Sequence, residues 1–226
     1  MLILLTNDDG YDSSRLKFAK ETLEKFGTVI VVAPLKQQSA KSMAISIKGF
    51  RYQKIDENLY IVDGTPADCV IFAINALNLK PDIVVSGINM GYNLGFDTYY
   101  SGTVAAATQA CFFGYKAMAV SGDWRGNRNI ERDFEGTLNY IFNYNLLGNG
   151  YILNVNFISE EIDINRGIKI TRRSKHIPRF SSHLTEDRYT QSRENKDGFY
   201  LENSDYHSVH TGYTSISKIP VLSNID

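Results

Sequence analysis

Short apolar runs alternate with helical patterns along most of the chain, and this alternation constrains the fold more than any other feature of the sequence. LILLT at residues 2–6 and the core of PDIVVSG at 81–87 are continuous apolar runs, typical of strands buried on both faces of a parallel sheet. The whole pattern predicts strands at 2–6, 28–33, 81–87, 116–121 and 150–157, and helices at 14–26, 65–77, 102–113 and 130–145. It indicates an α/β sandwich with a mainly parallel sheet.

The pattern changes after about residue 158, where the chain becomes polar, tyrosine-rich and strand-like. RGIKITRRSK at 166–175 and GYTSISKIP at 212–220 illustrate the change. We therefore expect a core of residues 1–158 and an extended, β-rich segment at 159–226, with hairpins, a C-terminal strand and a role in subunit contacts. Polar alternation at 44–64 predicts a further β-hairpin.

Composition narrows the range of partners. The chain has 24 Lys and Arg against 25 Asp and Glu, so no overall basic field favours a nucleic-acid polymer or an anionic membrane. No apolar run is long enough for a spanning helix, and Met1 leads directly into a strand rather than a secretory signal. Cys69 and Cys111 lie in apolar helical patterns and are expected to be buried free thiols. We expect a cytoplasmic protein.

Polar segments follow several predicted strands. NDDG at 7–10 follows the first strand, Ser39 lies in the loop after the second, and Asn89 follows the strand at 81–87. YSGT at 100–103 opens the next helix. Because ligands bind beyond the carboxyl ends of strands in an open parallel sheet, we expect these segments to meet at one edge.

Asp8 and Asp9 are neighbouring acids, and their repulsion grows when they lose contact with water. Alone, Asp-Asp-Gly is as well explained by a turn made by Gly10. The functional interpretation is a hard divalent cation, since a Mg²⁺ or Mn²⁺ site takes one or two carboxylates, neutral oxygens and water. Ser39 and Asn89 could supply the neutral oxygens.

The helix that begins at Ser101-Gly102-Thr103 follows a loop rich in glycine and asparagine. Free N–H groups at a helix start, flanked by two hydroxyls, bind anions readily, although a simple capped helix explains the pattern equally well. Metal and anion sites at one edge point to a phosphate ester. Asn93, Ser101 and Thr103 would hold phosphoryl oxygens, and one of the two aspartates could accept a proton from water.

Four ordered motifs carry a resemblance to a known family. LTNDDGYDSSRL, VVAPLKQQSAKSMAISI, GTPADCV and KPDIVVSGINMGYNLGFDTYYSGTVAAA together resemble the SurE family, the survival-protein 5′-nucleotidases. The resemblance implies a three-layer, Rossmann-like α/β/α core, hydrolysis of nucleoside 5′-monophosphates with one divalent cation per subunit, and homodimers or homotetramers. It implies metal ligands at Asp8, Asp9, Ser39 and Asn89, and phosphate-binding positions at Asn93, Ser101, Gly102 and Thr103.

Two alternatives stay open at this point. An aspartyl-nucleophile phosphatase needs Asp-x-Asp after the first strand, and Gly10 stands where the second Asp would be. A non-catalytic, receiver-type signalling module also gathers acids and a cation at a sheet edge, but the strand at 81–87 ends in Ser86-Gly87 rather than an aspartate.

The remaining candidate residues have either a structural interpretation alone or both a structural and a functional one. The aromatic side chains of Phe96, Tyr99 and Tyr100 could stack on a base or only cover the site. RRSK at 172–175 is expected to be an exposed strand face. The four histidines are expected at the surface or an interface, with His207 and His210 on opposite faces of an extended segment; they are His176, His183, His207 and His210.

Overall fold

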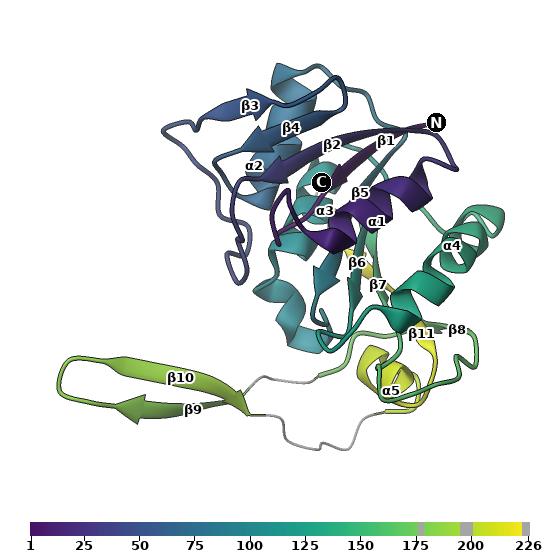
Figure 1. Cartoon of the computed structure of the whole chain (residues 1–226). Helices are drawn as coiled ribbons and strands as arrows, with labels where there is room; N and C mark the ends of the chain where they lie inside the picture. Colours follow the sequence, from purple (N-terminus) through teal and green to yellow (C-terminus); the bar gives the residue numbers. More distant parts are fainter. Residues whose placement is uncertain (176–178, 195–200, 223–226) are drawn as a thin grey trace.

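The structure is a computed structural model that describes residues 1–175, 179–194 and 201–222 of the chain (Figure 1). In these residues nine strands form one sheet, in the order β3-β4-β2-β1-β5-β6-β7-β11-β8. The strands from β4 to β7 in this order are parallel, whereas β3 runs antiparallel to β4 and β11 runs antiparallel to β7. The bounds are β1 Leu2–Thr6, β2 Thr28–Pro34, β3 Tyr52–Lys54, β4 Leu59–Val62, β5 Ile83–Met90, β6 Ala117–Gly122, β7 Tyr151–Asn156, β8 Ile168–Thr171 and β11 Thr214–Pro220.

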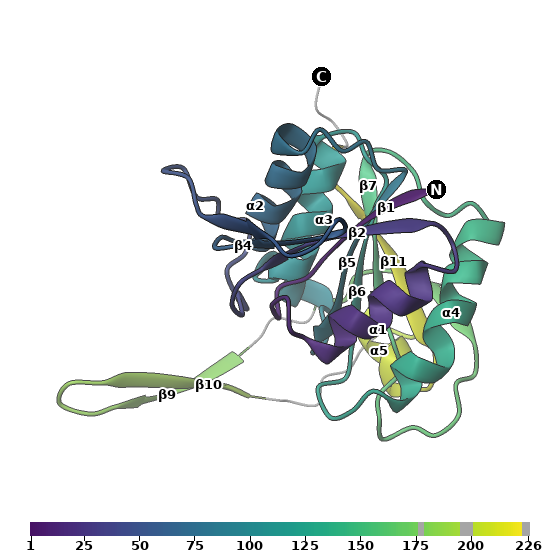
Figure 2. The ribbon, with the colours of Figure 1, turned by 45° about the horizontal axis from the view of Figure 1, so that its top comes forward.

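Helices cover both faces of the sheet, so the fold has three layers (Figure 2). Ile3 and Leu5 of β1 pack into the core beneath α1 and α4, while Leu4 packs into the core beneath α2 and α3. Burial on both faces explains why the strands are apolar throughout. The expected α/β/α fold with a mainly parallel sheet is confirmed. The helix bounds are α1 Ser14–Leu23, α2 Pro66–Ile71, α3 Gly102–Phe112 and α4 Arg128–Asn143.

The start of α2 follows directly from its sequence. Thr65 is the N-cap, and its Oγ1 accepts a hydrogen bond from the Asp68 amide (3.2 Å) while Asp68 Oδ2 accepts one from the Thr65 amide (2.9 Å). Pro66 occupies the first helical position, where a missing N–H leaves no bond unmade. A π-helical turn at Phe72–Ala76 continues the helix almost to the expected end at Leu77.

Strand β5 is longer than the sequence suggested, because Met90 is its last residue and Asn89 lies within it rather than in a loop. The pairing register with β6 shifts between Ser86 and Asn89, and the Gly87–Ile88 peptide is cis. Gly87 has a φ of +142°, and a Cβ there would lie 2.4 Å from the Val120 carbonyl oxygen. Only glycine fits this irregularity, after which Asn89 pairs with Ser121 of β6.

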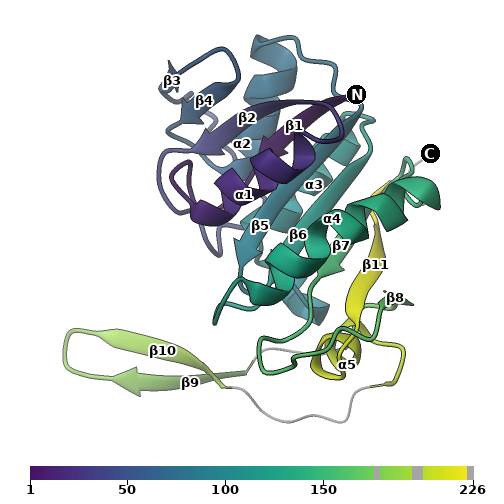
Figure 3. The same ribbon diagram turned by 45° about the vertical axis from the view of Figure 1, so that its right-hand side comes forward.

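The segment after residue 158 adds strands to the same sheet. Strand β11 inserts between β7 and β8 (Figure 3). The hairpin of β9 (Arg179–Leu184) and β10 (Tyr189–Glu194) extends away from the body of the molecule, as Figure 1 shows. The expected hairpin and C-terminal strand are therefore present. A role of this segment in subunit contacts stays a prediction.

One part of the expectation for this segment is wrong. Residues Asp205–His210 form a helix, α5, whose N-cap Ser204 accepts a hydrogen bond from the His207 amide. His207 and His210 therefore lie three residues apart on a helix and not on opposite faces of a strand. His183 lies on β9, and His176 lies outside the described residues.

Two smaller expectations concern thiols and membranes. Cys69 and Cys111 are buried free thiols, as expected, and burial raises the pKa of each. In the described ranges, every helix is too short or too polar to cross a bilayer.

Candidate active site

The turn after β1 is closed by Asn7 and Gly10, and not by the two acids between them. Asn7 Nδ2 donates to the Gly10 carbonyl (2.8 Å), and the Gly10 amide donates to Asn7 Oδ1 (3.3 Å). Gly10 has a φ of +106°, which favours glycine. Since the turn needs neither carboxylate, the explanation of Asp8 and Asp9 as turn residues loses its basis.

Asp8 is buried, with 3% of its surface exposed. Its Oδ1 accepts a hydrogen bond from Thr103 Oγ1 (2.7 Å), and the backbone amides of Thr103 and Asp8 also act on the carboxylate as donors. Burial raises the pKa of Asp8 to about 6, the Thr103 hydroxyl opposes this, and the charge of Asp9 adds to it. A buried carboxylate that no described cationic side chain neutralises is well prepared to bind a cation.

Asp9 is half-buried and its Oδ2 accepts a hydrogen bond from the Met90 amide at the end of β5 (3.0 Å). Burial raises the pKa of Asp9, while the Met90 amide and the positive charge of Arg15 lower it. The second acid is therefore tied to the strand that carries Asn89.

The first turn of α3 lies directly against Asp8. Ser101 is the N-cap, and its Oγ accepts a hydrogen bond from the Val104 amide (3.1 Å). A Cβ on Gly102 would lie 2.9 Å from Asp8 Cβ and 3.1 Å from Pro66 Cγ, so the close approach requires glycine. The amides of Gly102 and Thr103 remain at the helix start, where N–H groups favour an anion.

Asn89 and Ser39, the two candidate neutral ligands, have different surroundings. Asn89 Nδ2 donates to the Gly91 carbonyl (2.8 Å), which orients the side chain and leaves its Oδ1 to accept. Ser39 lies in an exposed loop, and its Oγ accepts a hydrogen bond from Gln37 Nε2. The loop is anchored at the site because the Gln38 amide donates to the Asp8 carbonyl (2.7 Å).

No hydrogen bond among the described residues joins Asn93 to these groups. It is buried, and its Nδ2 donates to Ser121 Oγ (2.8 Å). Its amide donates to Asn156 Oδ1 (2.9 Å), and its carbonyl accepts from Asn154 Nδ2 (2.8 Å). These bonds fix the loop between β5 and α3, and a direct role of Asn93 with phosphate stays a prediction.

A hollow of about 390 Å³ adjoins the start of α3. Met43, Tyr99, Ser101, Val104 and Arg173 are among the residues that line it. Tyr99 stacks on Phe96 with 5.8 Å between ring centroids, and Arg173 lies over the Tyr99 ring and donates to its Oη (3.0 Å). A larger hollow, about 860 Å³, lies between residues 172–175 and 201–204 and is lined by neither aspartate.

The donors at the site suit a hard divalent cation. Asp8 and Asp9 offer carboxylate oxygens, and Asn89 and Ser39 offer neutral ones, which are the kinds of ligand that Mg²⁺ and Mn²⁺ accept; that all four meet at one ion stays a prediction. No cluster of three or more His, Cys, Asp or Glu side chains that could hold a metal is found in the described residues, so a zinc-type site has no support there. The buried Asp8 carboxylate, which forms no ion pair with a described residue, is the observation that fits such an ion.

Arg15 was missed by the sequence reasoning although it lies next to this site. It is the second residue of α1 and only 2% exposed, and its Nη1 donates to the Asn89 carbonyl (2.7 Å). The sequence offered one clue, which is a cation in the first turn of a helix that has no acid there.

Comparisons with known proteins give relatives that match almost the whole chain. The family model described as Survival protein SurE matches residues 3–179 of the chain. The 5′-nucleotidase SurE of Actinobacillus succinogenes is 35% identical, covering 97% of this chain and 92% of its own length. The 5′/3′-nucleotidase SurE of Wigglesworthia glossinidia brevipalpis is 35% identical, covering 100% and 92%. The crystal structure of SurE from Aquifex aeolicus has a TM-score of 0.83 and 32% identity, and covers 99% of this chain and 95% of that one.

Proposed function

Because the chain belongs to the SurE family, we propose that it is a 5′-nucleotidase that hydrolyses nucleoside 5′-monophosphates to nucleoside and phosphate. We also propose that it uses one divalent cation, Mg²⁺ or Mn²⁺, per subunit. The observation that carries the proposal is the buried Asp8 carboxylate, which forms no ion pair with a described residue and lies directly beneath the first turn of α3. Cation and phosphate sites adjoin there, which is what hydrolysis of a phosphate ester requires.

The roles of the residues follow from their places. Asp8, Asp9, Ser39 and Asn89 would hold the cation, which when bound polarises the phosphorus centre and lowers the pKa of a water. The Gly102 and Thr103 amides and the Ser101 hydroxyl orient phosphoryl oxygens at the helix start, where negative charge is stabilised. One of the two carboxylates accepts the proton of the attacking water, and the ester oxygen leaves with the nucleoside.

The nucleoside has a place beside this centre. The hollow next to Ser101 is of the size that small ligands occupy, and it is lined by Tyr99, which stacks on Phe96, and by Arg173. Tyr100 is 54% exposed, and its carbonyl accepts a hydrogen bond from the Ser42 amide. These groups are our candidates for contact with the base.

We further propose that the protein is a cytoplasmic homodimer or homotetramer. The β9–β10 hairpin supports this, because in the described residues its main contacts are between its own two strands. The receiver-type module is not favoured, since β5, Ile83–Met90, contains no aspartate to be phosphorylated.

Turnover of a panel of nucleoside 5′-monophosphates with Mn²⁺, with and without EDTA, tests the proposal. The wild type should release phosphate only with the cation. Asp8→Asn should lower kcat/KM by about a thousandfold or more, since it removes a ligand charge at nearly constant shape. Asp12→Asn, which changes an exposed acid of the same loop, is the matched control and should keep wild-type activity. Absence of turnover with every divalent cation, or full activity of Asp8→Asn, would refute the proposal.

A further inference from the structure

Arg15 is a buried cation held only by neutral groups. Its five N–H groups all donate to oxygens at the ends of β5 and β6, namely Asn127 Oδ1 and the carbonyls of Asn89, Gly122, Asp123 and Gly126. None of the ion pairs found among the described residues includes Arg15. The guanidinium therefore acts as a fixed fork with every donor used.

The bond to Asn89 reaches the candidate metal centre through a single peptide. Arg15 Nη1 donates to the Asn89 carbonyl (2.7 Å), and the N–H of the same Asn89–Met90 peptide donates to Asp9 Oδ2 (3.0 Å). The carbonyl and N–H of a planar trans peptide point in opposite directions. Arg15 and Asp9 thus hold opposite sides of one rigid unit.

Two electrostatic costs accompany this arrangement. A cation in the first turn of α1 opposes the helix dipole, and a cation near a metal centre repels the metal ion. Burial also lowers the pKa of Arg15, an effect that Asp9 counteracts more than any other charge. A residue that served only to bind the metal electrostatically would carry the other sign, so the role of Arg15 has to be geometric.

The irregularity of β5 gives this geometric role a reason. The strand leaves its register with β6 between Ser86 and Asn89, so ordinary sheet pairing is interrupted just before the ligand position. We propose that Arg15 is a positioning residue of the metal centre, which orients the Asn89–Met90 peptide and thereby places Asn89 and Asp9 to bind a divalent cation. This inference rests on the proposed function.

The test is the affinity of the full chain for Mn²⁺ alone, measured by electron paramagnetic resonance and calorimetry without substrate. Arg15→Lys keeps the charge but loses the planar fork, and should weaken Mn²⁺ binding by about tenfold or more. The control is Arg125→Lys. Arg125 stabilises the same 122–127 loop through hydrogen bonds to Asp123 and Ser159. It forms no hydrogen bond to Asn89 or Asp9 among the described residues.

Arg125→Lys should lower the melting temperature and leave the Mn²⁺ affinity within about twofold of wild type, which separates positioning from loop stability. If Arg15→Lys does not fold, Asn127→Ala keeps the arginine while removing the acceptor of its Nε, and should weaken binding by about threefold. Wild-type affinity in the folded Arg15 or Asn127 variant, or an equal loss in Arg125→Lys, overturns the inference alone. Failure of the wild type to bind Mn²⁺ overturns the proposed metal dependence with it.

Discussion

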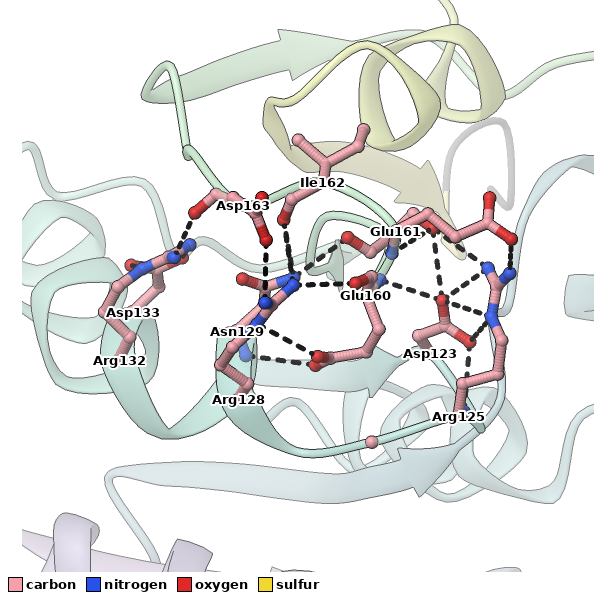
Figure 4. A network of polar contacts seen from close by, with 12 residues as sticks. Asp123, Arg125, Arg128, Asn129, Arg132, Asp133, Glu160, Glu161, Ile162 and Asp163 are labelled. Atoms are coloured by element: carbon pink, nitrogen blue, oxygen red, sulfur yellow. Dashed lines mark hydrogen bonds and ion pairs between the residues drawn. The ribbon is translucent and has the colours of Figure 1, made fainter.

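Two aspartates follow buried strands of the same sheet, and their surroundings shift their pKa values in opposite directions. Asp123 follows β6 and is 1% exposed, yet its two oxygens accept hydrogen bonds from Arg125, Ser159 and the Glu160 amide (Figure 4). Burial alone would raise the pKa of Asp123, but these donors outweigh it and lower the pKa to about 2. Asp8 follows β1, is buried to a similar degree, and has one hydroxyl donor and a pKa raised to about 6.

We infer from this difference that Asp123 is structural and that Asp8 is available for chemistry. Asp123 belongs to a network in which Arg125 also pairs with Glu161, while Arg128 pairs with Glu160 (Figure 4). Its charge is neutralised within the fold. The charge of Asp8 is compensated less, and we therefore expect the weakly compensated acid, and not the best connected one, to lie at the site.

The sharpest test of this contrast is the pH dependence of stability in EDTA. The pKa of Asp8 is raised, so the folded protein holds its proton more tightly than the unfolded chain, and stability falls as pH rises from about 4 to 6. Asp8→Asn cannot ionise. It should therefore exceed the wild type in free energy of unfolding above pH 6 by up to about 3 kcal/mol, with no gain below pH 4. Urea denaturation at several pH values measures this; an Asp8→Asn variant less stable than wild type at pH 8 would contradict it.

The opposite dependence of stability on pH is expected for Asp123. Its pKa is lowered, so its contribution is complete above about pH 4 and is lost as the pH falls toward 2. Asp123→Asn should cost about 2 kcal/mol at pH 7, because Arg125 loses its main partner, while kcat/KM stays within about threefold. The stability difference should shrink below pH 4. Loss of activity without loss of stability would break the comparison.

The third prediction concerns how closely α3 must approach Asp8. Gly102→Ala should lower kcat/KM by about tenfold, since the new Cβ would lie 2.9 Å from Asp8 Cβ and must displace the acid or the helix start. Gly136→Ala, in the exposed middle of α4 with open space around it, is the control and should raise stability by about 0.5–1 kcal/mol. Steady-state kinetics measure kcat/KM and thermal denaturation measures stability. A Gly102→Ala variant with wild-type kcat/KM would contradict the need for this close approach.

The smallest effect is expected at Ser39, whose side chain is exposed and neutral. Ser39→Ala should weaken Mn²⁺ binding by about threefold, since water can replace a hydroxyl ligand more easily than a carboxylate. Ser13→Ala is a suitable control, because the Ser13 side chain makes no cap hydrogen bond. A loss as large as that of Asp8→Asn would mean that the site depends on the loop as much as on the buried acids.

Much of the sheet could be predicted because burial on both faces leaves continuous apolar runs such as LILLT. Helix α5 could not, since SDYHSVH is short and polar, and only Ser204 and Asp205 hinted at its start. The end of β5 was predicted too early because glycine and asparagine usually end strands. Here Gly87 makes a bulge after which pairing with β6 resumes.

The residues of the candidate site also divide into those that the sequence predicts and those that it does not. Asp8, Gly102 and Thr103 could be predicted to meet because strand ends and helix starts share an edge of the sheet. Arg15 could not, because its acceptors stand 74 to 112 residues further along the chain and are mostly backbone carbonyls, which leave no trace in the sequence. The environment that separates Asp8 from Asp123 is likewise made by donors such as Glu160, which only the fold brings near.

The position of β11 has a consequence for synthesis of the protein. In the described sheet β11 is the last strand along the chain, yet it lies between β7 and β8 and pairs with both. While the chain is still emerging from the ribosome, β7 presents an unpaired edge and β8 has no neighbour. A chain that ends at a stop codon shortly before Thr214 would therefore expose the unpaired edge of β7, which can pair with other chains. Such prematurely terminated chains should be found with chaperones or in inclusion bodies.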